Sequence, residues 1–203
     1  MKNYNELIES GLLELYVLGQ TTPEESIEIQ QLALLNESVR KEIFEIEVSI
    51  EKYAETHAIE PNPIIKPFLL AMLDFSDRML AGETPFCAPM LSSDSKVEDF
   101  EVWLNREDLS IPQDFDNIHA KIISFTPEAV TAIVWIKEMA PQEVHDDQFE
   151  RFLVLEGTCD VTIDKDVHQL VAGDYLTIPL HTTHHVIVTS SIPCKVILQR
   201  VAA

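Results

Sequence analysis

The spacing of apolar residues changes once along this chain, from a helical repeat to a strand repeat. In roughly the first eighty residues apolar side chains return every three or four positions, as at Val39, Ile43 and Ile46, which places them on one side of a helix. After a stretch rich in proline and serine, the pattern becomes a succession of short β-type runs such as AVTAIVWI and RFLVLEG. We therefore expect an α+β protein of two domains, with a small helical bundle over 1–82, a linker over 83–97 and a β-sandwich or small barrel over 98–203.

Local signals indicate four helices in the first domain. TTPEE contains a capping box, with Thr22 as the cap and Glu25 three residues later, and EPNP separates the third helix from the fourth. The fourth helix, IIKPFLLAMLDFSDRML, is more apolar than three short partner helices could cover. Its surplus residues either anchor a partner protein, complete the bundle core or pack on the barrel: Ile65, Phe68, Leu69 and Met72.

Charge and cysteine content narrow the classes of partner. The chain has 35 acidic and 14 basic residues, a net charge of −21, so it repels nucleic acid and attracts basic protein surfaces. Its three cysteines form no CxxC pattern, which fits a reducing cytoplasm. No apolar run approaches the ~20 residues of a membrane span, and the start of the chain has no signal-peptide pattern. We expect a cytoplasmic, unprocessed protein without membrane contact.

The segment EVHDDQFERFLVLEG has the residues and spacing of a metal site. Glu143 and His145 are two apart on a strand and share a face, and Glu150 reaches the same interior if the residues between them bulge. His184 lies on the inward side of a later strand, by its parity with Val186. Two imidazoles and two carboxylates suit one transition metal ion, zinc, iron, nickel or manganese, and the oxygen ligands move the preference slightly toward manganese and iron.

Residues 137–188 resemble the cupins in two motifs. The first motif is matched by Glu143, His145, Glu150 and Gly157, with glutamate in place of the usual first histidine, and the second by Gly173, Pro179 and His184. The resemblance implies a cupin double-stranded β-helix, a jelly-roll-like barrel that holds one metal ion and commonly pairs into a homodimer through its sheets. The sequence leaves open whether Glu143 binds the metal or indicates that metal binding has been lost.

Residues 8–75 resemble the N-terminal helical domain of bacterial anti-sigma factors, through LLELYVLG, TPEE and NESVRKEI, without the HxxxCxxC of zinc-type members. A helical domain of this kind followed by a cupin is the arrangement of ChrR-type regulators. The resemblance implies a non-enzymatic regulator of transcription in a stress response, which binds an extracytoplasmic-function sigma factor and senses a signal through its cupin. The alternative is a small metal-dependent cupin enzyme, of the dioxygenase or isomerase type, with a helical dimerisation domain.

Overall fold

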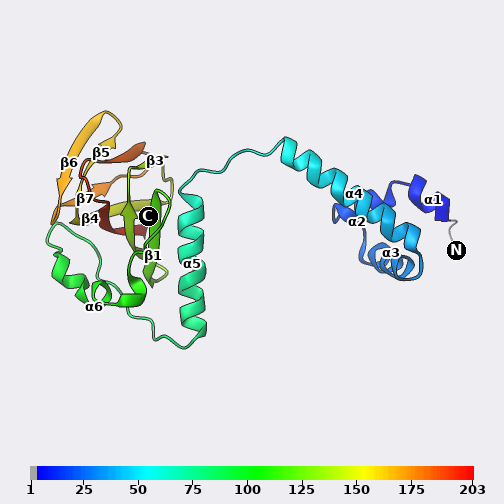
Figure 1. Ribbon diagram of the computed structural model, residues 1–203, viewed down its shortest axis with the longest axis horizontal. Helices are drawn as coiled ribbons and strands as arrows, with labels where there is room; N and C mark the ends of the chain where they lie inside the picture. Colours follow the sequence, from blue (N-terminus) through cyan, green and yellow to red (C-terminus); the bar gives the residue numbers. More distant parts are fainter. Residues whose placement is uncertain (1–3) are drawn as a thin grey trace. The chain divides into compact units, whose positions relative to one another are not determined.

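The chain forms two compact units, Met1–Glu60 and Pro61–Ala203, in a computed structural model that describes residues 4–203 and side chains from Leu7 onward (Figure 1). The first unit is helical and the second holds one long helix and all the described strands. The helices of the first unit are α1 (Tyr4–Glu9), α2 (Leu12–Val17), α3 (Pro23–Leu35) and α4 (Glu37–Thr56). Among the described residues, no helix combines the length and apolar character needed to cross a membrane.

The helical unit has a small core. Four side chains, one from each helix, are buried together: Leu7, Leu13, Ile29 and Val39. The predicted capping box is present at the start of α3, where the Glu25 amide donates to Thr22 Oγ1 at 3.2 Å and the Thr22 amide to Glu25 Oε2 at 2.9 Å. Such a core buries little apolar area, and the unit leaves several large apolar side chains on its surface.

The helix α5 (Ile65–Leu80) belongs to the second unit and not to the helical bundle. It lies along β1 (Ile118–Phe125), where Phe68, Met72 and Phe75 pack against the core of the strands (Figure 1). Asp74 also pairs with Lys121 of β1 at 2.7 Å. The predicted boundary after residue 82 therefore differs from the observed one after Glu60, because periodicity identifies an apolar helix face but not the body that it covers.

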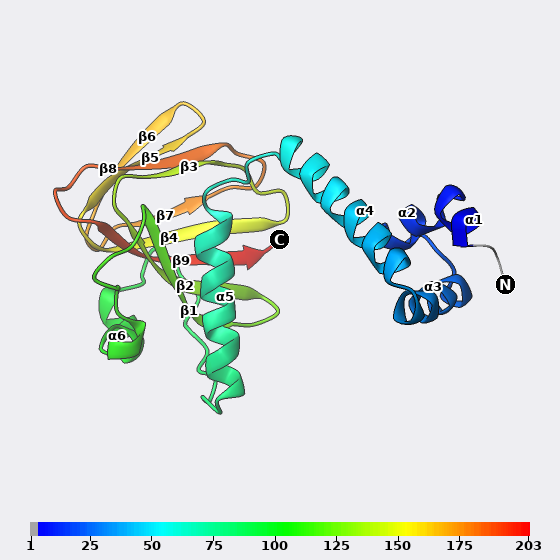
Figure 2. The same ribbon diagram turned by 45° about the vertical axis from the view of Figure 1, so that its right-hand side comes forward.

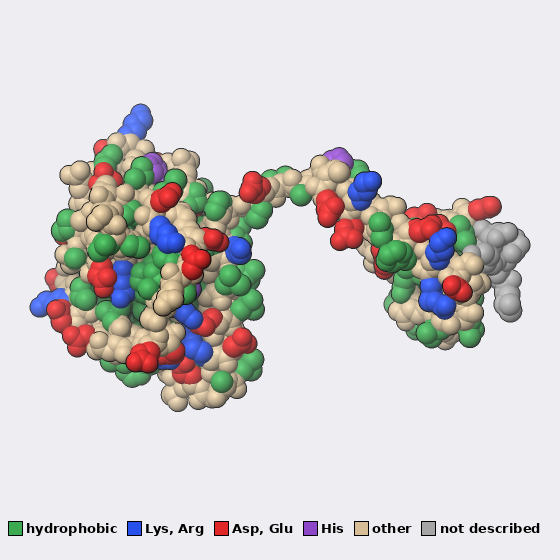
Figure 3. Space-filling model, viewed as in Figure 1, with side chains coloured by type: hydrophobic (Ala, Val, Ile, Leu, Met, Phe, Trp, Pro, Cys, Tyr) green, Lys and Arg blue, Asp and Glu red, His purple; other side chains and the backbone are tan. Residues whose placement is uncertain are grey.

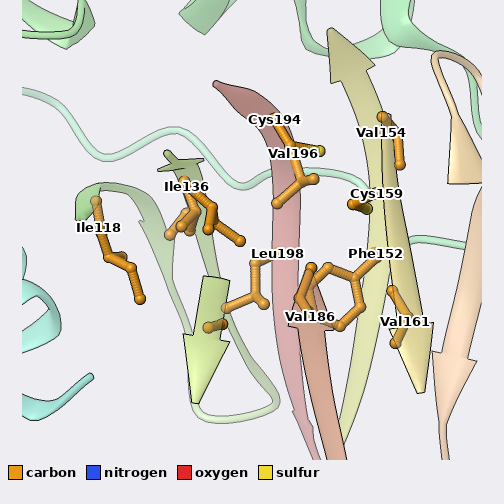
Figure 4. Packing of buried hydrophobic residues seen from close by; sticks show 14 of the residues in the cluster. Ile118, Ile136, Phe152, Val154, Cys159, Val161, Val186, Cys194, Val196 and Leu198 are labelled. Atoms are coloured by element: carbon orange, nitrogen blue, oxygen red, sulfur yellow. The ribbon is translucent and has the colours of Figure 1, made fainter. Parts of the chain in front are cut away.

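Two antiparallel sheets face each other in the second unit (Figure 2). One has the order β1-β2-β9-β4-β7 and the other β3-β8-β5-β6. Side chains from both inner faces fill the space between them, among them Phe152, Val161, Val186 and Leu198 (Figure 4). The remaining strands are β2 (Ala129–Ile136), β3 (Met139–Glu143), β4 (Gln148–Glu156), β5 (Thr158–Ile163), β6 (Asp166–Val171), β7 (Tyr175–Ile178), β8 (His184–Val188) and β9 (Cys194–Ala202).

The segment that precedes β1 covers the outer face of the five-stranded sheet. It contains η1 (Val97–Phe100), α6 (Glu101–Leu104) and η2 (Glu107–Leu109), and it buries Phe100 and Trp103 against that sheet. The stretch 83–97, predicted as a linker, is anchored as well. Leu91 is fully buried, and its amide donates to Oε1 of the buried Gln199 at 2.8 Å, while Gln199 Nε2 donates to the Pro89 carbonyl at 3.1 Å. Proline and serine thus mark irregular backbone here, not a free tether.

Candidate metal centre

The candidate site lies at one end of the barrel, where β3, β4 and β8 meet. Glu143 ends β3 and is the register partner of His184, the first residue of β8. His145 follows in the turn between β3 and β4, and its carbonyl accepts a hydrogen bond from the His181 amide at 2.8 Å. Glu150 lies on β4, so the turn between residues 143 and 148 does bring both motif positions to one interior.

Three of the four predicted ligands form one cluster. The ligand atoms of His145, Glu150 and His184 all lie within 4.8 Å of one another. His184 Nε2 is 2.8 Å from Glu150 Oε2, and His145 Nε2 is 3.6 Å from the same oxygen. His145 Nε2 is buried, yet no hydrogen-bond partner reaches it from the described residues. A buried nitrogen without a hydrogen bond is costly, so its position beside two other ligand atoms fits a metal–ligand bond.

Glu143 lies beside this cluster and pairs with Arg200. Arg200 Nη2 donates to Glu143 Oε2 at 3.1 Å, and Arg200 Nε donates to Glu150 Oε1 at 3.1 Å. The two Glu150 oxygens therefore differ, because Oε1 contacts the guanidinium and Oε2 contacts the imidazoles. Sequence reasoning missed Arg200. The sequence does contain a signal for it: Arg200 lies two residues after Leu198 and so shares the inward face of β9, where an arginine needs a carboxylate partner.

The carboxylates have opposite pKa shifts. Burial, and then repulsion by Glu150, raises the pKa of Glu143, against a smaller opposing effect of Arg200. Burial alone would raise the pKa of Glu150 as well, but the neighbouring His145, His184 and Arg200 lower it below its usual range. Burial is the largest effect on the pKa of His184 and lowers it, but the hydrogen bond and charge of Glu150, the Thr182 carbonyl and the charge of Glu143 together outweigh burial and raise the pKa. Glu150 is thus held in the ionised form that a metal ligand requires.

The donor set fits a transition metal ion. Two imidazoles and one carboxylate are a ligand set used by zinc and by non-haem iron, and manganese and nickel also accept it. Three protein ligands leave further coordination positions to small molecules. Two further groups orient these ligands: Arg200 donates to Glu150, and the Thr182 carbonyl lies 3.3 Å from His184 Nδ1.

The four residues predicted to bind a partner divide into two pairs. Phe68 and Met72 pack against the barrel core and are not free for a partner. Ile65 and Leu69 are exposed over 53% and 57% of their surface, on the outward face of α5. Hydrophobic side chains are visible along this edge of the barrel unit (Figure 3). Of the three interpretations that the sequence leaves open, packing on the barrel accounts for Phe68 and Met72.

Comparison with known proteins identifies the β-sandwich as a cupin domain. The model of the cupin domain family matches residues 131–199, which include His145, Glu150 and His184 but neither α5 nor Arg200. Over 44 residues, 22% of this chain, the sequence is 43% identical to quercetin 2,3-dioxygenase from Bacillus subtilis, and this match spans only 13% of that enzyme.

Several solved structures match part of this chain. KdgF from Halomonas sp. is 21% identical, with a TM-score of 0.42 over 48% of this chain and 94% of that one. The cupin domain of Schizosaccharomyces pombe Cnp3 is 11% identical, with a TM-score of 0.41 over 44% of this chain and 67% of that one. A cupin superfamily protein from Desulfitobacterium hafniense is 16% identical, with a TM-score of 0.41 over 46% and 84%.

Proposed function

We propose that the protein is an anti-sigma factor whose metal-binding cupin domain acts as the sensory part. The helical unit would bind an extracytoplasmic-function sigma factor, and the state of the cupin would tune that binding. The observation that carries this proposal is the helical unit itself, a compact unit of sixty residues distinct from the unit whose residues form the candidate metal centre.

The surface of the helical unit supports a role in protein binding. Large apolar side chains are exposed on α3 and α4, including Leu34 at 79% and Phe44 at 63%. Acidic side chains are visible on the face of the helical unit that Figure 3 shows, and the first 60 residues contain 13 acidic and 4 basic residues. A basic partner with an apolar docking face would be attracted to this surface over a long range and held by apolar contacts.

The metal centre supports the sensory role. A bound metal would supply an electrophilic centre at which a small molecule with an oxygen or nitrogen donor could bind. The protein's own part is to hold that centre at the floor of an apolar pocket, with Glu150 kept ionised and Arg200 balancing its charge. Among the described residues that line this pocket, the further groups that could act as an acid or base are Glu143, which is paired with Arg200, and His185.

Co-purification tests the proposal. The full chain is co-expressed with an extracytoplasmic-function sigma factor encoded beside it, and the mixture is analysed by size-exclusion chromatography with light scattering. We expect a 1:1 complex, weakened at high salt because the attraction is electrostatic. Comparing metal-loaded and chelator-treated protein then shows whether the centre alters the affinity. Absence of a complex in both metal states contradicts the regulatory role.

A metal-dependent dioxygenase is the second candidate, favoured by the 44-residue likeness to quercetin 2,3-dioxygenase and by the three-ligand cluster. Oxygen uptake by the metal-loaded chain with quercetin or a simpler flavonol tests it. Uptake that is lost in Glu150→Gln, together with no sigma-factor complex, would favour the enzyme over the regulator.

A further inference from the structure

The space in front of the metal centre is closed by α5. Glu143, Glu150, His184 and Arg200 form its polar floor, His185 and apolar strand residues form its sides, and Ile64 and Phe68 line it from α5 and the residue before it. The free volume that remains is about 20 Å³, the room for a single water molecule. A larger ligand therefore cannot reach this space while α5 stays seated.

Phe68 occupies part of the space in front of the metal centre. Its ring lies under the Arg200 guanidinium, with 4.8 Å between the Arg200 Cζ and the ring centroid, and it packs against the barrel core. Arg200 is already paired with Glu143 and Glu150, so the floor offers no free positive charge to an anion. The Phe68 ring therefore lies face-on to an arginine whose charge is already balanced by carboxylates, a position that suits an uncharged apolar group.

The two ends of α5 are held differently. The C-terminal half is fixed by ion pairs, from Asp74 to Lys121 at 2.7 Å and from Arg78 to Glu83 at 2.9 Å. At the other end, Ile64 and Phe68 make apolar contacts and the single contact with Arg200, and the N-cap residue Ile64 gives no side-chain cap. The ion pairs therefore hold the last turns of the helix to the barrel more firmly than apolar contacts hold its first turns.

We propose that Phe68 is an intramolecular plug, and that a small, uncharged, ring-sized apolar molecule binds above the metal centre by displacing it together with the first turns of α5. Ligand binding and the seated helix then exclude each other. Under the proposed regulatory function, this competition would carry the signal, since residues 57–64 connect these turns of α5 to the helical unit. The binding site itself does not depend on that function.

Toluene is a suitable probe, because it matches the phenyl ring of Phe68 in size and carries no charge. Binding of toluene to the full chain is measured by ligand-observed NMR, and backbone opening by hydrogen exchange, for wild type, Phe68→Ala and the control Leu69→Ala. Leu69 lies on the same helix but is exposed, so its truncation removes similar apolar mass without opening the space. Phe68→Leu serves as a milder variant should Phe68→Ala fail to fold.

We expect Phe68→Ala to bind toluene at least about tenfold more tightly than wild type, with Phe68→Leu between them and Leu69→Ala equal to wild type. In wild type, saturating toluene should speed exchange of amides 65–72 and leave amides 74–80 unchanged. Equal affinity of wild type and Phe68→Ala, no binding to either, or slower exchange over 65–72 would each overturn the plug. The assay contains no sigma factor, so its outcome is separate from that of the regulatory proposal.

Discussion

Glu150 and Arg200 are register partners on β4 and β9, and Arg200 Nε lies 3.1 Å from Glu150 Oε1. This contact uses one carboxylate oxygen and leaves the other, Oε2, to the imidazoles of His145 and His184. The same guanidinium also neutralises Glu143 and stacks on Phe68. Arg200 therefore connects the candidate metal centre to α5, although it lies outside the residues that match the cupin family.

Replacing Arg200 with methionine should destabilise the fold in the absence of metal. The change leaves Glu143 and Glu150 close together without their cation, and removing one partner of a buried pair costs about 3 kcal/mol. Urea unfolding of the metal-free protein measures the loss. Adding Glu143→Gln to Arg200→Met should recover part of it, because one of the two unpaired charges disappears.

The exposed Lys165 provides the control for this series, since Lys165→Met removes a cation from the turn between β5 and β6 and should change stability by less than about 0.5 kcal/mol. If Arg200→Met is as stable as Lys165→Met, the arginine does not balance the two carboxylates.

Loss of either a carboxylate or an imidazole from the cluster should abolish metal binding. Purified wild type should carry about one transition metal ion per chain, and Glu150→Gln and His184→Ala should carry almost none, because each removes one of three ligands. Elemental analysis by mass spectrometry gives the stoichiometry. His181→Ala is the matched control: this imidazole belongs to the same loop region but is exposed and pairs with Asp146. Equal metal content in all four proteins would place the metal elsewhere.

Glu83 should make a pH-dependent contribution to stability. Its hydrogen bonds to Arg106 lower its pKa, burial opposes this, and Arg78 lowers it further. Because the pKa is lower in the folded than in the unfolded chain, the ionised carboxylate stabilises the fold above the unfolded pKa of about 4.3, and this stabilisation is lost as the pH falls through the folded pKa.

We therefore expect Glu83→Gln to lower the free energy of unfolding by about 1 kcal/mol near neutral pH, a small loss because solvent screens this partly exposed group. This gap in stability between the variant and wild type should close at acidic pH. Urea unfolding at several pH values measures the gap, with the exposed Glu101→Gln as control. A gap that stays constant down to acidic pH would show that the carboxylate acts through packing and not through its charge.

The sequence was sufficient for the fold class and for part of the site. The change of apolar period separates helices from strands, and the capping box at Thr22 is confirmed. Spacing and strand parity bring His145, Glu150 and His184 to one interior, because alternate strand residues share a face. These features depend on residues close in sequence or on a simple repeat.

Features that depend on distant segments could not be predicted. The apolar face of α5 would suit either the helical bundle or the barrel, and only the packing on β1 decides between them. Glu143 lies beside the predicted ligands, 3.8 Å from His145 Nε2, but its ion pair with Arg200, 57 residues later, could not be predicted from local spacing. Gln199 likewise holds the stretch around Leu91 across more than a hundred residues, so a sequence that reads as a linker is anchored.

The two glycines of the cupin-like motifs should respond differently to alanine. Both have positive φ, 75° at Gly157 and 94° at Gly173, so each substitution carries backbone strain of about 1 kcal/mol. A Cβ at position 173 would meet nothing within 4 Å, whereas one at position 157 would lie 3.0 Å from the Pro193 carbonyl oxygen and 3.1 Å from Cys194 Cα. Those two atoms belong to the backbone that leads into β9 and cannot rotate away.

Gly157→Ala should therefore cost about 2 kcal/mol more than Gly173→Ala, since the added methyl must push two strands apart at the edge of the barrel core. Urea unfolding of the two variants under the same conditions measures the difference, and Gly173→Ala serves as the control for strain alone. Equal costs would mean that the loop before Cys194 yields easily. In that case the glycine at position 157 would be required for its φ and not for the close approach of β9.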